Sequence, residues 1–143
     1  MGQQQLLLIV LGIVIVGIAI AVGVTQFKSS AVESNRQNVI SDLLNYAAKA
    51  QRFYKTPTAL AGGGQDFNGF FLAAVDTGNA NGSYSVTATQ PSGASYVAGA
   101  VTPISSSADS IYIVGCGKEQ NASNYVKAYA TVTSDNIVTT VLN

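Results

Sequence analysis

Histidine is absent from this sequence of 143 residues, and with it the side chain most often used as a general base and as a metal ligand. Charged residues are scarce too, at 10% of the chain against about a quarter in a typical soluble domain. Seven basic and seven acidic side chains cancel, so no net field attracts nucleic acid or an anionic membrane surface. The composition predicts a protein that is not an enzyme, with no catalytic residue, metal or cofactor.

Cysteine is nearly absent as well, because Cys116 is the only one. A single cysteine excludes an intrachain disulfide and a zinc site built on cysteines. Cys116 ends the strand-like run 111–116, so we predict that it is a small buried hydrophobic residue. The alternative is a reactive or cross-linking thiol. Without disulfides, the fold has to be stabilised by packing or by assembly.

The hydrophobic residues are concentrated near the start of the chain. Every residue from Leu6 to Val24 is Leu, Ile, Val, Ala or Gly, and no charged side chain occurs before Lys28. As a helix this run is roughly 28 Å long, close to the hydrocarbon thickness of a bilayer of about 30 Å. The run therefore predicts a helix that can cross a membrane.

An ordinary cleavable signal peptide fits this run poorly, because the run is long and nothing basic precedes it. Lys28 and Arg36 follow the run, and the positive-inside rule would then leave the C-terminal part in the cytoplasm. Removal of a basic leader resolves this conflict, so we expect Met1 to be the first residue of the mature chain. The alternative is that Met1 is the start residue and that cleavage follows Gly2.

The helical pattern continues beyond the apolar run. A set of apolar residues recurs at spacings of three, four or seven, and polar residues such as Glu33, Arg36 and Asp42 lie on the other faces of the helix. This set is Val32, Val39, Ile40, Leu43, Ala47, Ala50 and Phe53 or Tyr54. Nothing breaks the helix before Pro57, so one helix from Gln5 to Tyr54, roughly 75 Å long, is predicted. Its first half has to project from any domain of this size.

Glycines interrupt the apolar part at Gly12, Gly17 and Gly23. Each costs up to about 1 kcal/mol of helix propensity relative to alanine. Gly17 with Ala21, and Ala19 with Gly23, form pairs of small residues of the kind that lets helices approach closely. We predict helix packing at these positions; the alternative is ordinary tolerance of glycine in a membrane segment.

The rest of the chain predicts an antiparallel sheet after a loop-rich connection over residues 58–81. Phe67, Phe70 and Phe71 are expected to pin this loop, with its glycine run 62–64, to the domain. Alternation and β-branched content predict strands at Ser83–Thr89, Ala94–Val101, Ser110–Gly115, Tyr125–Val132 and Ile137–Leu142. The amphipathic helix would cover one face of this sheet. The predicted fold is α+β: an apolar helix (1–27), its amphipathic continuation (28–56), and a loop and sheet region that we call the head (57–143).

This order of features resembles a type IV pilin. The resemblance rests on the polar start Gln3–Gln5, the uncharged run Leu6–Val24 and the amphipathic continuation to Tyr54. It implies that the apolar half is held in the inner membrane and later packs with its copies in the centre of an extracellular filament, with the heads outside. It also implies a prepilin peptidase that removes the leader, a methylated N-terminus, and an assembly motor with a platform protein.

Two departures from the pilin pattern stand out. With Met1 as the first mature residue, Gln5 lies where most pilins carry a glutamate that pairs with a neighbouring N-terminal amine. We hypothesise that Gln5, with Gln3 or Gln4, binds that amine by amide hydrogen bonds; the alternative is that the three glutamines form a polar border. The apolar half also lacks the proline found in many pilins, and Gly23 is a weaker candidate for softening the helix there.

Two other functions fit the same sequence: a pseudopilin of a secretion system, and a membrane-anchored binding domain that does not polymerise. The low charge and the Ser-, Thr- and Asn-rich C-terminal part favour a surface-exposed filament. Asn81 and Asn121 each begin an Asn-X-Ser triplet, which makes them possible glycan acceptors.

Overall fold

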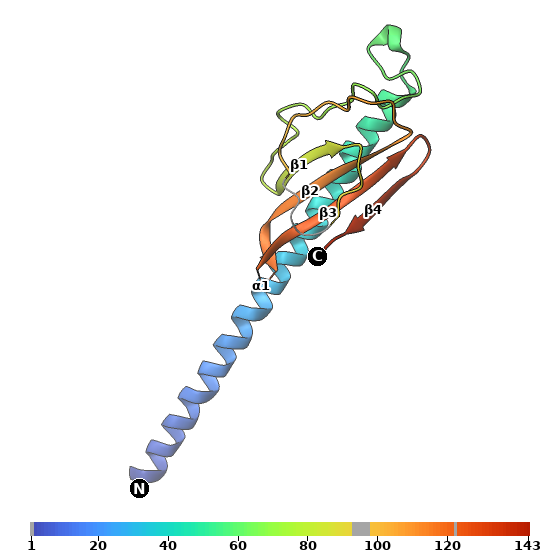
Figure 1. The fold of residues 1–143 in the computed structure, drawn as a ribbon. Helices are drawn as coiled ribbons and strands as arrows, with labels where there is room; N and C mark the ends of the chain where they lie inside the picture. Colours follow the sequence, from blue (N-terminus) through green and yellow to red (C-terminus); the bar gives the residue numbers. More distant parts are fainter. Residues whose placement is uncertain (1, 93–97, 122) are drawn as a thin grey trace.

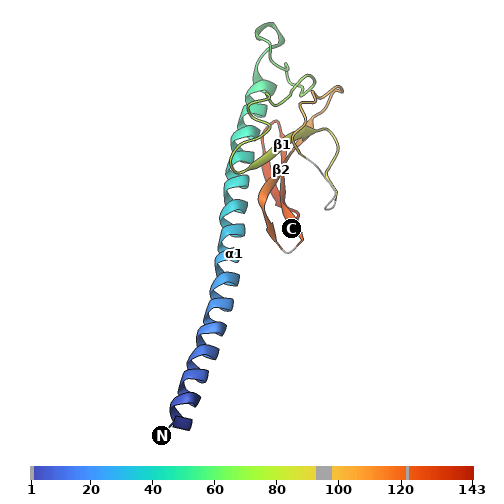
Figure 2. The same ribbon diagram turned by 90° about the vertical axis from the view of Figure 1, so that its left-hand side faces the viewer.

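A computed structural model describes residues 2–92, 98–121 and 123–143, and shows one long helix beside a four-stranded sheet (Figures 1 and 2). The elements in chain order are α1 (Gly2–Lys55), the short 3-10 helix η1 (Thr58–Leu60), β1 (Gly82–Thr87), β2 (Ser110–Asn121), β3 (Asn124–Thr133) and β4 (Ile137–Val141). The predicted α+β class, with a projecting helix and an antiparallel sheet, is confirmed.

Helix α1 runs without interruption for 54 residues, which corresponds to about 80 Å. It starts three residues before and ends one residue after the predicted limits. At its C-terminal end, the N–H and the hydroxyl of Thr56 both donate to the carbonyl oxygen of Arg52, at 3.0 and 2.7 Å. Pro57 then follows, where no further helical N–H is available. The helix thus ends where the sequence pattern predicts.

The sheet is a meander in which every neighbouring pair is antiparallel, in the order β1-β2-β3-β4. The strand predicted at Ala94–Val101 is wrong where it can be compared, because residues 98–101 are not in a strand; residues 94–97 lie outside the described residues. Gly99 has a φ of 117°, a conformation that regular strands do not contain. Strand β2 continues six residues beyond its predicted end at Gly115.

The core lies between the sheet and the second half of α1. Val39, Leu43, Ala47 and Ala50 of the helix are fully buried against the sheet, as the helical periodicity predicts. Gly115 faces the helix, because a Cβ at this position would lie 2.8 Å from Cγ1 of Val39. The missing side chain at Gly115 thus lets the helix lie close to β2.

The loop between α1 and β1 is fixed to the C-terminal end of α1 by aromatic contacts. The ring of Phe67 lies 4.8 Å from that of Tyr54, and the ring of Phe70 lies 5.5 Å from that of Phe53. Phe67 and Phe70 are buried, which confirms the prediction for these two residues. The prediction is wrong for Phe71, which is 53% exposed. The loop is therefore part of the packed head.

The prediction that Cys116 is buried is wrong. Because side chains alternate along β2, Gly115 occupies the helix-facing position and Cys116 points to the opposite face. There it is partly exposed and lines a hollow with Tyr125 and Lys127. Glycines flank Cys116 in the sequence and carry no apolar pattern, so the sequence does not indicate which residues of this stretch face the core.

Candidate functional site

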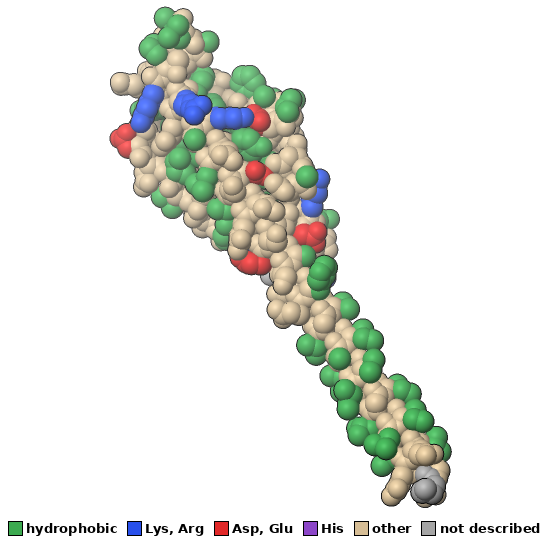
Figure 3. Space-filling model, turned by 180° about the vertical axis from the view of Figure 1, so that it is seen from behind, with side chains coloured by type: hydrophobic (Ala, Val, Ile, Leu, Met, Phe, Trp, Pro, Cys, Tyr) green, Lys and Arg blue, Asp and Glu red, His purple; other side chains and the backbone are tan. Residues whose placement is uncertain are grey.

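The first half of α1 is an apolar surface that nothing in the described part of the subunit covers. Its large side chains are 51% to 71% exposed from Leu6 to Val24, and Phe27 is 79% exposed. In the view of Figure 3, hydrophobic side chains follow this half, whereas charged side chains gather on the other end of the molecule. By length and composition the helix can cross a membrane. A surface of this size is unfavourable in water, so lipid or other protein has to cover it.

Packing within the described part of the subunit does not require glycine at Gly12, Gly17 or Gly23. A Cβ built at Gly12, Gly17 or Gly23 meets no atom within 4 Å. These positions, with Ala21, lie on a helix surface that is exposed throughout. Gln5 is also exposed, Gly2 is the first helical residue, and Met1 lies outside the described residues. Nothing in the described part of the subunit covers these residues.

The sheet region is attached to α1 through Asp42, a residue expected on a polar face of the helix. Oδ2 of Asp42 accepts hydrogen bonds from Nδ2 of Asn79 at 2.7 Å, Nδ2 of Asn81 at 2.8 Å and the hydroxyl of Tyr84 at 2.7 Å. The ring of Tyr84 is fully buried and contacts the ring of Tyr46 edge-on, at 4.9 Å. One carboxylate thus holds the start of β1 and the turn before it against the helix.

The environment of Asp42 favours its charged form. Burial alone raises the pKa of this carboxyl, but the hydrogen bonds from Asn81, Tyr84 and Asn79 outweigh it and hold the pKa below its ordinary value. Burial, together with the hydrogen bond to Asp42 and its negative charge, raises the pKa of Tyr84. The pair therefore stays as carboxylate and neutral phenol throughout the physiological range.

This network predicts a dependence of stability on acid. Because the pKa of Asp42 is lower in the folded state, its contribution is complete above the unfolded value of 3.8 and is lost as the pH falls through the folded value. Urea unfolding of the full chain in detergent, followed by tyrosine fluorescence, should show the Asp42→Asn variant and the wild type converging as the pH drops below 3.8. Asp66, whose pKa is lowered chiefly by Ser107, contributes equally to both proteins. A constant difference at every pH would contradict the prediction.

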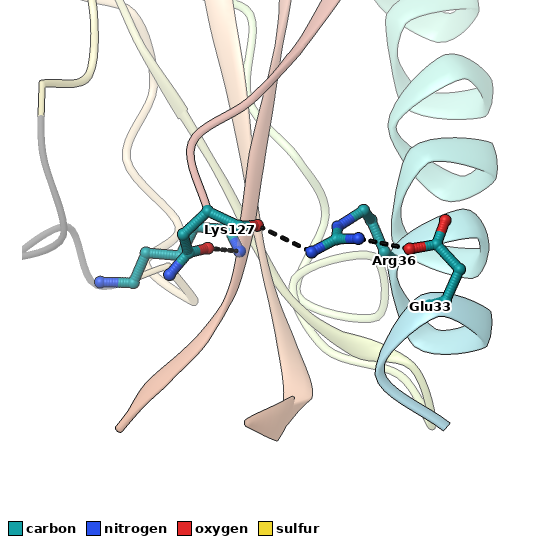
Figure 4. Close-up of polar contacts among 4 residues, drawn as sticks. Glu33, Arg36 and Lys127 are labelled. Atoms are coloured by element: carbon teal, nitrogen blue, oxygen red, sulfur yellow. Dashed lines mark hydrogen bonds and ion pairs between the residues drawn. The ribbon is translucent and has the colours of Figure 1, made fainter. Parts of the chain in front are cut away.

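A second set of hydrogen bonds, which we call the Arg36 clasp, joins the C-terminal residues to the helix (Figure 4). Arg36 pairs with Glu33 and donates through Nη2 to the backbone oxygen of Asn143, at 3.3 Å. The side chain of Asn143 accepts from the backbone N–H of Lys127 and donates to the carbonyl of Tyr125, both at 2.8 Å. The Asp42 network and this Arg36 clasp together fix both ends of the sheet region, β1 and the C-terminus, to the helix.

The two predicted glycan acceptors lie in different surroundings. The amide nitrogen of Asn81, the atom that a glycan would occupy, already donates to Asp42. Asn121 is the last residue of β2, next to the turn into β3. Glycosylation of either residue stays a prediction, and the hydrogen bonding at Asn81 argues against that site.

Among residues 2–92, 98–121 and 123–143, no group of three His, Cys, Asp or Glu residues could hold a metal ion. The arrangement as a whole is α+β: a long N-terminal helix whose second half packs on a four-stranded antiparallel sheet, as in a pilin-like fold. Comparison with protein-family models, with curated proteins and with solved structures finds no match. The function is therefore inferred from the fold and from the exposed helix.

Proposed function

We propose that this chain is the structural subunit of an extracellular pilus-like filament, which polymerises through the apolar half of α1. The observation that carries the proposal is the uncovered apolar surface from Leu6 to Val24, continuous with a firmly attached head. In a filament, copies of this helix would cover one another and leave the low-charge heads outside. Before assembly, the inner membrane would cover the same surface.

The energetics of this proposal require further partners. Moving the helix from lipid to a protein core changes the hydrophobic free energy little, so packing between helices decides whether the filament is stable. Extraction from the membrane then needs a motor and a platform protein. Removal of a leader needs a prepilin peptidase. These partners are part of the proposal.

The direct test is electron microscopy of material sheared from the cell surface, with the subunit identified by mass spectrometry. We expect long filaments that contain this chain, and the measured mass fixes the N-terminus, its methylation and any glycan. Short periplasmic assemblies would identify a pseudopilin instead. A chain that stays in the membrane under all conditions would identify an anchored binding domain. Either result would overturn the proposal.

The polar start of the helix gives a second test. In the filament, Gln5 is proposed to accept a hydrogen bond from the N-terminal amine of a neighbour, and a hydrogen bond to a charged group is worth about 1.5–3 kcal/mol. With Gln3 and Gln4 partly compensating, we expect Gln5→Ala to lower the filament yield about tenfold, and Gln5→Glu to preserve it. Gln37→Ala, an exposed position on the same helix, is the matched control. Normal yield and stability of Gln5→Ala filaments would leave the three glutamines as a polar border.

A further inference from the structure

A hollow opens on the face of the sheet that points away from α1, near the turn from β2 into β3. It measures about 460 Å³, which is within the range of small-molecule sites, about 300–1,000 Å³. Ser83, Cys116 and Lys127 are direct neighbours on three adjacent strands and line it as one row. Its other lining residues include Ala98, Lys118 and Tyr125. We call it the Lys127 hollow.

Lys127 is almost completely buried, yet its charge has no partner. The residue is 8% exposed, and its side chain extends away from α1 and lines the hollow (Figure 4). Its backbone N–H donates to Asn143, but Nζ forms no hydrogen bond or ion pair with any of the described residues. An ammonium that is withdrawn from water without a partner destabilises the fold, whereas a methionine of similar length would pack without this cost. A lysine at this position therefore points to a ligand that pairs with it.

The Lys127 hollow combines two positive side chains with no negative one. Lys118 and Lys127 both line it, and residues 77–108, which include all of β1, contain no charged side chain. Asp109 lies just before β2, about 23 Å of strand from the hollow. Glu119 follows Lys118 in the chain but lines a different hollow, beside α1. The other five acidic side chains bind partners elsewhere, namely Glu33, Asp42, Asp66, Asp76 and Asp135. An anionic group in the hollow thus meets two cations and no competing carboxylate.

The remaining lining groups suit a sugar ring. Tyr125 is 48% exposed, so its ring offers an apolar face on which the C–H face of a pyranose can stack. The hydroxyls of Tyr125 and Ser83 can exchange hydrogen bonds with sugar hydroxyls. Nucleic acid fits less well, because its binding relies on many phosphate contacts, whereas the hollow supplies two cations in a chain with zero net charge. The hollow is thus suited to a single sugar ring with one acidic group.

We propose that the Lys127 hollow binds a sugar unit that carries one acidic group, either a carboxylate or a phosphate. The acidic group binds Nζ of Lys127 and of Lys118, the ring stacks on Tyr125, and the sugar hydroxyls meet Ser83. In the proposed filament α1 faces the centre, so this face of the sheet points outward and is open to saccharides of surrounding surfaces. The site is complete within one subunit, and the inference therefore goes beyond the proposed function without depending on polymerisation.

Saturation-transfer NMR of the full chain in detergent, titrated with single sugars, tests this inference. The acidic ligands are methyl glucuronide, which carries a carboxylate, and glucose 6-phosphate. Methyl glucoside is the neutral control, and inorganic phosphate is added as a competitor without a ring. We expect at least one acidic sugar to bind about tenfold more tightly than methyl glucoside, which is the effect of one charge-assisted hydrogen bond. A preference for the glucuronide identifies a uronate ligand, and a preference for glucose 6-phosphate identifies a sugar phosphate.

Variants of the lysines separate binding from folding. Lys118→Gln and Lys127→Met should each lower the affinity for the acidic sugar about tenfold. Lys55→Gln, at an exposed lysine at the C-terminal end of α1, should leave it unchanged. Because Lys127→Met also removes a buried charge without a partner, we expect its midpoint of urea unfolding to rise above that of the wild type. Circular dichroism verifies that all three variants are folded.

Four outcomes would overturn the inference: no preference for an acidic over the neutral sugar, displacement of the acidic sugar by inorganic phosphate at equal concentration, an unchanged affinity in either lysine variant, or a lower urea midpoint of Lys127→Met. The second would identify free phosphate as the ligand, and the last would show that Lys127 stabilises the fold itself. The measurement is made on unassembled chains, so it is independent of filament formation. Filaments without sugar binding sink this inference alone, and sugar binding without filaments sinks only the proposed function.

Discussion

Replacing Asp42 with alanine is expected to lower the free energy of unfolding by about 2–4 kcal/mol. The change removes one acceptor and leaves three donors, from Asn79, Asn81 and Tyr84, without their partner. The buried hydroxyl of Tyr84 suffers most, because water cannot reach it without opening the contact between β1 and the helix. A loss of this size is a large fraction of the stability of a small domain.

Urea unfolding of the full chain in detergent, followed by tyrosine fluorescence, measures this loss. Asp135→Ala is the matched control, since Asp135 is exposed in the turn between β3 and β4, where its side chain accepts a hydrogen bond from the neighbouring Ser134. We expect the control to change the stability by less than about 0.5 kcal/mol. Equal stabilities of the two variants would show that the network around Asp42 does not hold the head to the helix.

The sequence predicted the helix and its buried face because both follow from local spacing. Val39, Leu43, Ala47 and Ala50 recur with the period of the helix, and each is fully buried in the structure. Asp42 could not be found in this way. Its partners lie 37 to 42 residues away, in a turn without a periodic pattern and at the start of β1, so only the folded chain brings them together.

In the sheet, too, the parts with a clear local pattern were predicted and the parts without one were not. The strands rich in Val, Ile, Tyr and Thr were predicted to within a few residues, except that β2 runs on past Gly115. The small residues at 98–101 also resemble a strand in composition, but Gly99 adopts a positive φ there. Cys116 was misplaced because neighbouring glycines carry no apolar pattern from which to assign a face.

The attachment of the head and the exposure of the helix support one another in the proposed function. Force applied to a filament passes between the helices and the heads, so each head has to stay on its helix. Besides the apolar core, the Asp42 network and the Arg36 clasp connect α1 to segments far along the chain. The apolar half, by contrast, keeps its large side chains exposed along its whole length and available to a partner.

The glycines of the apolar half give the largest expected effect on assembly. In the single subunit, a Cβ added at Gly17 would meet no atom within 4 Å, and a leucine there should strengthen the helix by up to about 1 kcal/mol. If Gly17 and Ala21 are where helices of neighbouring subunits approach closely, the larger side chain separates them. Overpacking of this kind costs about 1–3 kcal/mol at each contact, and every added subunit carries the same change.

We therefore expect Gly17→Leu to reduce the filament yield by about tenfold to a hundredfold, while the helix content and the membrane insertion of the subunit stay normal. Ile18→Leu is the matched control, because it keeps the volume of an exposed neighbour. Sheared filaments are counted by electron microscopy, and circular dichroism in detergent follows the subunit. Because the substitution is harmless within one chain, a loss of filaments comes from a contact with another molecule, either a neighbouring subunit or a protein of the assembly machinery. Normal filaments of Gly17→Leu would mean that this glycine is only tolerated, and that the helices pack through another face.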